Sequence, residues 1–233
     1  MNLTRSLCFD LETVALPQAA DYVPPPDLDS VAAPGTWKDP VKIADEIARK
    51  RVALEAEYVT AVQRAALDWN LGRIVAIGTA IDGGPAQVTV CHDEDQERQA
   101  LMAFWALAQR QRLIGFNARS FDAPYLIQRS RYLDVPYTEL NLARYGRGDI
   151  IDLREILTFD DARYEAIMPR SLDTFCRRFG IVVDDPTTGA DIAAMVARDD
   201  WEGVEAHCRA DVQRTRLLAE RLHILKPVVE VVA

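Results

Sequence analysis

An apolar run meets two acids in Ser6-Leu7-Cys8-Phe9-Asp10-Leu11-Glu12-Thr13-Val14, near the start of the chain. If this segment is a buried strand, Asp10 and Glu12 project from one face, about 7 Å apart, because side chains alternate with period two. Two buried carboxylates need a counter-charge, and a divalent cation supplies one. Asp-x-Glu is also common in proteins of this size, so the pair alone leaves a metal site and a chance pairing open.

Composition limits the class of protein. The 233 residues are 49% apolar, which suits one large domain with a full core, or a domain with a sizeable insertion. The formal net charge of −9 argues against a protein coated in positive charge for nucleic acid. A nuclease is still compatible with this charge, because bound cations cancel the charge of a metal-binding acid cluster.

Targeting and redox signals indicate the cytoplasm. The sequence has no apolar run long enough to span a bilayer and no signal-peptide pattern at its N-terminus, so we expect no membrane association. The cysteines are scattered without metal-ligand spacing and are expected to be reduced core thiols, namely Cys8, Cys91, Cys176 and Cys208.

The order of predicted elements indicates an α/β domain with a mixed sheet. After the first strand, a proline-rich loop leads to a long polar helix at about 41–68. A strand at 71–81, a turn and a return strand at 87–91 form a hairpin. A helix capped by Asp93 then runs to about 112, and a short strand follows at 113–116. Further helices are predicted at 122–132, 153–157, 171–179, 190–197 and 201–222.

A polar turn follows the short strand that ends at Phe116. The segment continues Asn117-Ala118-Arg119-Ser120-Phe121-Asp122, and Asp122 opens a helix. Ligands bind at the carboxyl ends of strands in α/β sheets, which makes Asp122 a candidate ligand. A plain helix N-cap explains an aspartate at this position equally well.

The last helix carries His207 and Asp211 four residues apart, so both point from one helical face. They interrupt a side that otherwise carries apolar residues such as Val204 and Leu218. A surface ion pair within the helix is the alternative explanation for this pair.

The three segments together resemble a known family. Phe9-Asp10-Leu11-Glu12-Thr13, Asn117-x-x-x-Phe121-Asp122 and His207-x-x-x-Asp211 resemble, in order and context, the motifs of the DEDD 3'-5' exonuclease superfamily. The chain is similar in particular to the proofreading exonuclease domains of family B DNA polymerases and their free-standing bacterial or phage relatives. This resemblance implies an RNase H-like fold, in which helices flank a mixed five-stranded sheet. It also implies a single domain over residues 1–233, with a helical insertion at roughly 16–70 after the first strand.

The resemblance also implies an activity and its residues. By matching motifs, the metal ligands are Asp10, Glu12, Asp122 and Asp211. Two Mg²⁺ or Mn²⁺ ions about 3.5–4 Å apart activate a water and stabilise the leaving 3' oxygen in such a site. The implied reaction removes nucleotides from the 3' ends of single-stranded DNA, and RNA is the alternative substrate. The biological context that the resemblance implies is proofreading or DNA repair, with a polymerase as partner. The substrate-binding candidates are Asn117, Phe121 and Thr13.

His207 departs from the family pattern. Family members carry either a tyrosine four residues before the last aspartate or a histidine five residues before it. Here a histidine occupies the tyrosine's spacing, and one residue corresponds to 100° around a helix. His207 is therefore predicted to point where the tyrosine would. Histidine as a residue type loses its proton near pH 6.5, whereas tyrosine does so near pH 10. We hypothesise that it is the general base for the attacking water.

Three alternatives accompany this interpretation. Asp149 and Asp152 are reserve acids, and Asp152 is equally suited to cap the helix at 153–157. The first motif also resembles that of haloacid-dehalogenase-like phosphatases, but those need a second aspartate in place of Glu12 and a lysine later in the sheet. The lysines of this chain are not well placed for that role, namely Lys38, Lys42, Lys50 and Lys226. An inactive RNase H-like module that binds nucleic acid or a polymerase is the third alternative, and the four retained acids argue against it.

Overall fold

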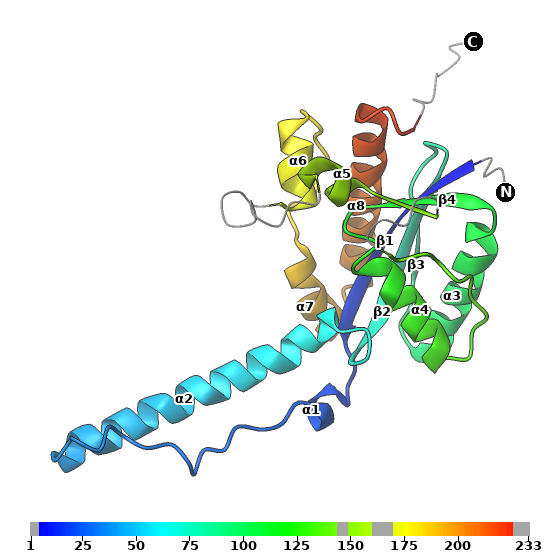
Figure 1. Ribbon diagram of the computed structural model, residues 1–233. Helices are drawn as coiled ribbons and strands as arrows, with labels where there is room; N and C mark the ends of the chain where they lie inside the picture. The colour runs from blue at the N-terminus through cyan, green and yellow to red at the C-terminus, as the bar shows by residue number, and fades with distance from the viewer. Residues whose placement is uncertain (1–4, 144–148, 160–169, 226–233) are drawn as a thin grey trace. The chain divides into compact units, whose positions relative to one another are not determined.

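The computed structural model describes residues 5–143, 149–159 and 170–225 (Figure 1). The chain forms two compact units. One comprises the residues up to Thr13 together with those from Arg73 onward, and the other comprises Val14–Gly72. The first unit carries the sheet and all the predicted site residues.

The sheet of the described residues has five strands in the order β3-β2-β1-β4-β5. They are β1 (Arg5–Ala15), β2 (Gly72–Ile81), β3 (Gln87–Val90), β4 (Gln111–Gly115) and β5 (Ile150–Asp152). β4 runs parallel to β1 and β5 parallel to β4, whereas β3 is antiparallel to β2. The predicted RNase H-like mixed sheet is therefore confirmed.

Helices cover both faces of this sheet (Figure 1). α3 (Glu94–Ala108) and α4 (Asp122–Tyr132) lie on one face. α8 (Trp201–Arg221) lies on the other face, with α5 (Leu153–Thr158), α6 (Leu172–Arg178) and α7 (Ile192–Ala197) packed against it. No described helix combines the length and the apolarity that a bilayer crossing requires.

The predicted end of the helix after Asp93 is wrong. Asp93 does cap α3, by accepting the N–H of Gln96, but the helix ends at Ala108 and not at 112. Arg110 adopts a left-handed backbone with φ of 62°, which turns the chain. Gln111 then pairs with Arg5 at the start of β4. Gln111 and Arg112, which the local sequence pattern assigned to the helix, therefore belong to β4 and pair with β1.

Alternation along β1 directs its acids toward α8. The ring of Phe9 packs on Phe104 of α3 with 5.5 Å between ring centroids, on one face of the sheet. Cys8 belongs instead to the buried cluster that includes Val212 of α8. Asp10 and Glu12 share the parity of Cys8 and therefore face α8.

A glycine brings α8 close to the sheet. A Cβ added at Gly78 of β2 would lie 2.5 Å from Val212 Cγ2 and 2.8 Å from Cys208 Sγ, closer than atoms pack. Because Gly78 lacks that atom, α8 lies directly on the backbone of β2. His207 and Asp211, one residue from these contacts, are thereby held at the sheet.

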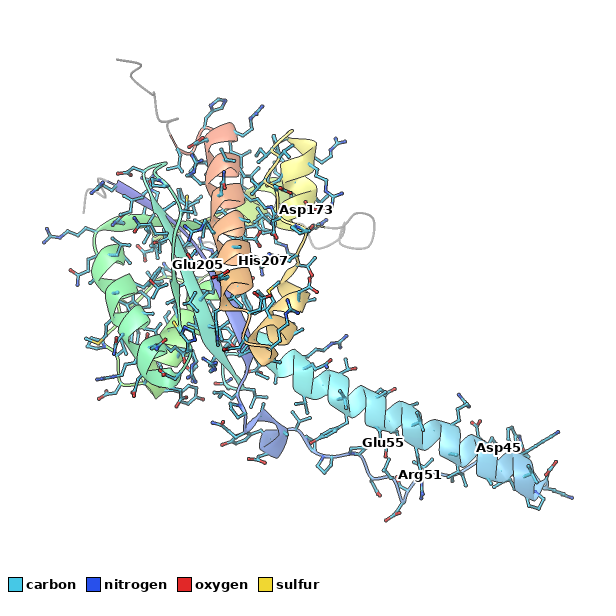
Figure 2. The ribbon with its side chains drawn as sticks, turned by 180° about the vertical axis from the view of Figure 1, so that it is seen from behind. Asp45, Arg51, Glu55, Asp173, Glu205 and His207 are labelled. Carbon is cyan, nitrogen blue, oxygen red and sulfur yellow. The ribbon has the colours of Figure 1, made fainter. Side chains whose placement is uncertain are left out.

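The unit of residues 14–72 is built around one long helix. It contains α1 (Ala19–Tyr22), α2 (Pro40–Arg64) and the 3₁₀ turn of Ala65–Leu67, so the polar helix predicted at 41–68 is present. Asp39 caps α2, and no residue of this helix is buried. Lys50 and Arg51 donate to carbonyls of the preceding extended segment, at 2.9 and 3.0 Å. Figure 2 shows the position of Arg51 on α2.

Candidate active site

The structure brings the four predicted acids together. Asp10 and Glu12 lie on β1, Asp122 in the first turn of α4, and Asp211 on α8. The backbone N–H of Leu11, between the two β1 acids, donates to Asp122 Oδ1 at 3.1 Å. Three elements that are far apart in sequence therefore deliver carboxylates to one place.

Burial and the closeness of other carboxylates raise the pKa values of three of these carboxyl groups. Burial raises the pKa of Asp10 well above its ordinary value, and the neighbouring charges of Asp122, Asp211 and Glu12 raise it further. The pKa of Glu12 is raised well above its ordinary value for the same reasons. Burial is also the largest cause that raises the pKa of Asp122, to about 7. Without a counter-charge, the cluster therefore resists full ionisation.

This crowding predicts how the metal-free protein responds to pH. Between the ordinary value of 3.8 and about 7, the folded state holds a proton on Asp122 that the unfolded state has released. The free energy of unfolding therefore falls as pH rises through this window, by on the order of several kcal/mol. We expect the melting temperature of the metal-free protein to fall accordingly, and millimolar Mg²⁺ or Mn²⁺ to restore it at neutral pH.

Asp122→Asn is the matched variant for this measurement, since it removes the titrating carboxyl without a change of size. Its melting temperature is expected to depend less on pH than that of the unmodified protein. A melting temperature of the unmodified, metal-free protein that rises through the same window would contradict the prediction.

His207 is buried on α8 (Figure 2). It lies between two sets of carboxylates, Asp185 on one side and Glu12 and Asp211 on the other. Its Nδ1 is 2.8 Å from Asp185 Oδ2 and 3.0 Å from Thr187 Oγ1. Its Nε2 is 3.8 Å from Glu12 Oε1 and 3.9 Å from Asp211 Oδ2. The Nε2 edge therefore faces two of the four acids, at distances too long for direct hydrogen bonds.

Arg214 joins the two sets of carboxylates on the same helix. Its Nη1 donates to Asp185 Oδ2 at 2.9 Å and to Asp211 Oδ1 at 2.5 Å. Asp185 and Arg214 were not predicted from the sequence. The spacing of seven residues from His207 places Arg214 on the same helical face and could have identified it, whereas Asp185 lies in an irregular segment that carries no such signal.

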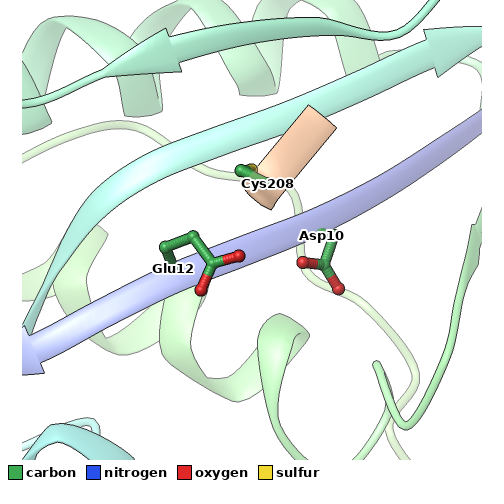
Figure 3. A group of neighbouring side chains, drawn as sticks. All are labelled: Asp10, Glu12 and Cys208. Carbon is green, nitrogen blue, oxygen red and sulfur yellow. The ribbon is translucent and has the colours of Figure 1, made fainter. Parts of the chain in front are cut away.

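The donor set fits a hard divalent cation. Glu12 Oε1 is buried and has no hydrogen-bond partner among the described residues, so this carboxylate oxygen is available as a ligand. The ligating atoms of Glu12, His207 and Asp211 lie within 4.8 Å of one another, as do those of Asp10, Glu12 and Cys208 (Figure 3). Carboxylate oxygens are the ligands that Mg²⁺ and Mn²⁺ prefer.

The cysteine in this group is not a thiolate. Burial raises the pKa of the Cys208 thiol well above its ordinary value, and the charges of Glu12 and Asp10 raise it further. The thiol therefore keeps its proton and packs under Gly78. All four cysteines of the chain are unpaired and buried, as predicted.

The substrate-binding candidates lie within five residues of the predicted acids in sequence. Asn117 has a left-handed backbone with φ of 64°, and its Oδ1 accepts from Ser120 Oγ at 2.7 Å and from Arg154 Nη1 at 2.9 Å. Phe121 is half-buried and packs on Tyr125, with ring centroids 5.4 Å apart. Thr13 is half-buried and directly follows Glu12 on β1. Their part in substrate binding stays a prediction.

The reserve acids have structural partners. Asp152 caps α5, as its alternative reading predicted, by accepting the N–H of Arg154 at 2.9 Å. It also accepts the N–H groups of Asn117 and Arg119, at 2.9 and 3.0 Å, and so holds the turn that leads to Asp122. Asp149 accepts the N–H of Asn141 at 3.0 Å.

A five-stranded mixed sheet with helices on both faces and converging carboxylates defines an exonuclease-like α/β domain. The family described as "Predicted 3'-5' exonuclease related to the exonuclease domain of PolB" matches residues 66–231, and the chain belongs to this family. Asp10 and Glu12 precede the matched residues, whereas Asp122, His207 and Asp211 lie within them.

The solved structures that resemble this chain include the family B DNA polymerase from the hyperthermophilic archaeon Pyrobaculum calidifontis. The TM-score is 0.57 at 18% sequence identity, over 94% of this chain. The match spans 24% of the polymerase chain, so the likeness concerns the fold of one part of that protein. No curated protein matches the sequence.

Proposed function

We propose that the protein is a metal-dependent 3'-5' exonuclease that hydrolyses the terminal phosphodiester bond of single-stranded nucleic acid, with DNA as the preferred substrate. The observation that carries this proposal is the convergence of Asp10, Glu12, Asp122 and Asp211 from β1, α4 and α8. One buried oxygen of Glu12 also has no hydrogen-bond partner in the part of the chain that the structure describes. Membership of the exonuclease family supports the reaction class.

In this proposal the four carboxylates hold two divalent cations, Mg²⁺ or Mn²⁺. Bound there, the cations supply charge stabilisation for the attacking and leaving oxygens of an in-line displacement. The four carboxylates bind the cations, and the positive charge of the cations neutralises the negative charge of the carboxylates. The bound cations thus provide the counter-charge that a buried cluster of carboxylates requires.

His207 has the role of proton acceptor in the same proposal. The attacking water forms a bond to phosphorus, gives one proton to Nε2 of His207, and the bond from phosphorus to the 3' oxygen breaks. That oxygen takes a proton from solvent, and His207 returns its proton to solvent. The position of Nε2, facing Glu12 and Asp211 at 3.8 and 3.9 Å, supports this role. Asn117, Phe121 and Thr13 are proposed to hold the terminal nucleotide.

The test is a digestion of 5'-labelled single strands of DNA and of RNA, with Mg²⁺, with Mn²⁺ and with a chelator. We expect a ladder of products shortened one nucleotide at a time from the 3' end, only with added metal, and faster on DNA. Faster digestion of RNA would identify an exoribonuclease. Binding without cleavage of either polymer under all metal conditions would overturn the proposal in favour of an inactive module. The predicted polymerase partner and cytoplasmic location stay predictions.

A further inference from the structure

Asp185 is a buried acid outside the four proposed metal ligands. It lies in the irregular segment before α7, with its side chain 6% exposed. Its Oδ1 accepts from the backbone N–H and the hydroxyl of Thr187, at 3.0 and 2.5 Å. Its Oδ2 lies 2.8 Å from His207 Nδ1 and accepts from Arg214 Nη1 at 2.9 Å. Both oxygens of this carboxylate therefore have hydrogen-bond partners within the protein.

These contacts define which nitrogen of the His207 ring carries the proton. An ionised carboxylate only accepts hydrogen bonds, so at 2.8 Å Nδ1 must donate to Asp185. The Thr187 hydroxyl donates its hydrogen bond to Asp185 Oδ1. Toward His207 Nδ1, which lies 3.0 Å away, Thr187 Oγ1 can therefore act only as an acceptor. Both neighbours of Nδ1 thus favour a proton there, which leaves a lone pair on Nε2 in the neutral ring.

The ionised state of Asp185 has a physical cause. Burial raises the pKa of this carboxyl, but the hydrogen bonds from Thr187 and His207 outweigh burial, and the net pKa lies below its ordinary value. The guanidinium of Arg214 adds a fixed positive charge at 2.9 Å. The guanidinium of Arg214 also contacts Asp211. It therefore holds the Asp185 carboxylate beside His207 and orients Asp211, one of the proposed metal ligands.

We propose that Asp185 is a positioning residue of this site: it fixes His207 in the tautomer whose Nε2 lone pair faces Glu12 and Asp211. The inference rests on the proposed nuclease function for its catalytic consequence, because in that function the Nε2 lone pair of His207 accepts the proton of the attacking water. A hydrogen-bonded carboxylate behind an imidazole orients the ring in this way in other enzymes. Asp185 contacts Thr187, His207 and Arg214 and is not one of the four proposed metal ligands.

The first test measures the tautomer directly and needs no nuclease activity. The chain has three histidines, His92, His207 and His223, so two-dimensional ¹⁵N NMR of the metal-free protein gives three imidazole patterns, and His207→Gln assigns one of them. At a pH where the ring is neutral, we expect His207 to show a protonated Nδ1 and an unprotonated Nε2. A protonated Nε2 in the unmodified protein would overturn the inference.

The second test compares Asp185→Asn with Asp191→Asn. Asp191 lies in the same segment, accepts from Thr188 instead of His207, and is exposed, so it is the matched control. We expect Asp185→Asn to lower kcat about a hundredfold or more with little change in KM, because a general base contributes roughly 10²–10⁴-fold. Its His207 pattern should shift toward the Nε2-protonated form, whereas Asp191→Asn should leave both readouts unchanged.

The outcomes separate this inference from the proposed function. An Asp185→Asn variant that keeps the kcat and tautomer of the unmodified protein would overturn the role of Asp185. If the unmodified protein cleaves no substrate, the nuclease proposal fails, and the NMR pattern still decides whether Asp185 sets the tautomer. If Asp185→Asn does not fold, as judged by thermal melting, the tautomer of the unmodified protein decides the question alone.

Discussion

Asp10→Ala is expected to lower the rate of 3' end hydrolysis by about a thousandfold or more. Asp10 interacts electrostatically with all three other acids of the cluster, so its carboxylate is central to the proposed cation site. Without it, the site has fewer ligands and less negative charge to hold divalent cations. The measurement is the initial rate of digestion of a 5'-labelled single strand at saturating Mg²⁺ or Mn²⁺.

The same substitution should stabilise the metal-free protein at neutral pH. Burial and neighbouring charges oppose ionisation of Asp10, and alanine removes this unfavourable charge. We therefore expect a higher melting temperature without metal, and a smaller rise when metal is added. A loss of activity with a raised melting temperature cannot be explained by unfolding.

Asp95→Ala is the control for both measurements. Asp95 is exposed in the first turn of α3 and belongs to the same compact unit, but not to the site. We expect this variant to cleave at the rate of the unmodified protein. An Asp10→Ala variant that retained activity within about tenfold of that control would refute the proposed role of Asp10.

Glu97→Ala is expected to destabilise the fold by about 3–5 kcal/mol, the largest effect on stability that we predict. Glu97 and Arg129 are a buried ion pair between α3 and α4, with side chains 0% and 2% exposed. Arg129 donates to both carboxylate oxygens, at 2.7 and 2.8 Å, and Ile74 of β2 donates its N–H to the same group at 2.9 Å. Alanine leaves a buried guanidinium without its main counter-charge.

Glu94→Ala is the matched control, because Glu94 binds the same guanidinium at 3.1 Å from a side chain that is 57% exposed. Its loss is expected to cost about 1 kcal/mol or less, as for other solvent-exposed ion pairs. Urea denaturation of the metal-free proteins measures both free energies of unfolding. Equal costs for the two variants would show that burial does not set the value of the Glu97–Arg129 pair.

The sequence by itself determined the elements that carry the candidate site. Alternation in β1 predicted that Asp10 and Glu12 share a face, and i,i+4 spacing predicted the same for His207 and Asp211 on α8. The helix that begins at Asp122 was predicted with the bounds that it has. These patterns are local and periodic, so a short stretch of sequence is enough to define them.

Only the tertiary structure decided which groups surround those side chains. β5 has three residues and exists as a strand through its pairing with β4, so no local pattern predicted it. The contact of Asp185 with His207 joins an irregular segment to a helix 22 positions further on, and the Glu97–Arg129 pair joins two helices 32 positions apart. Such contacts form when packing excludes water and forces buried charges to find partners, and this requirement leaves no periodic trace in the sequence.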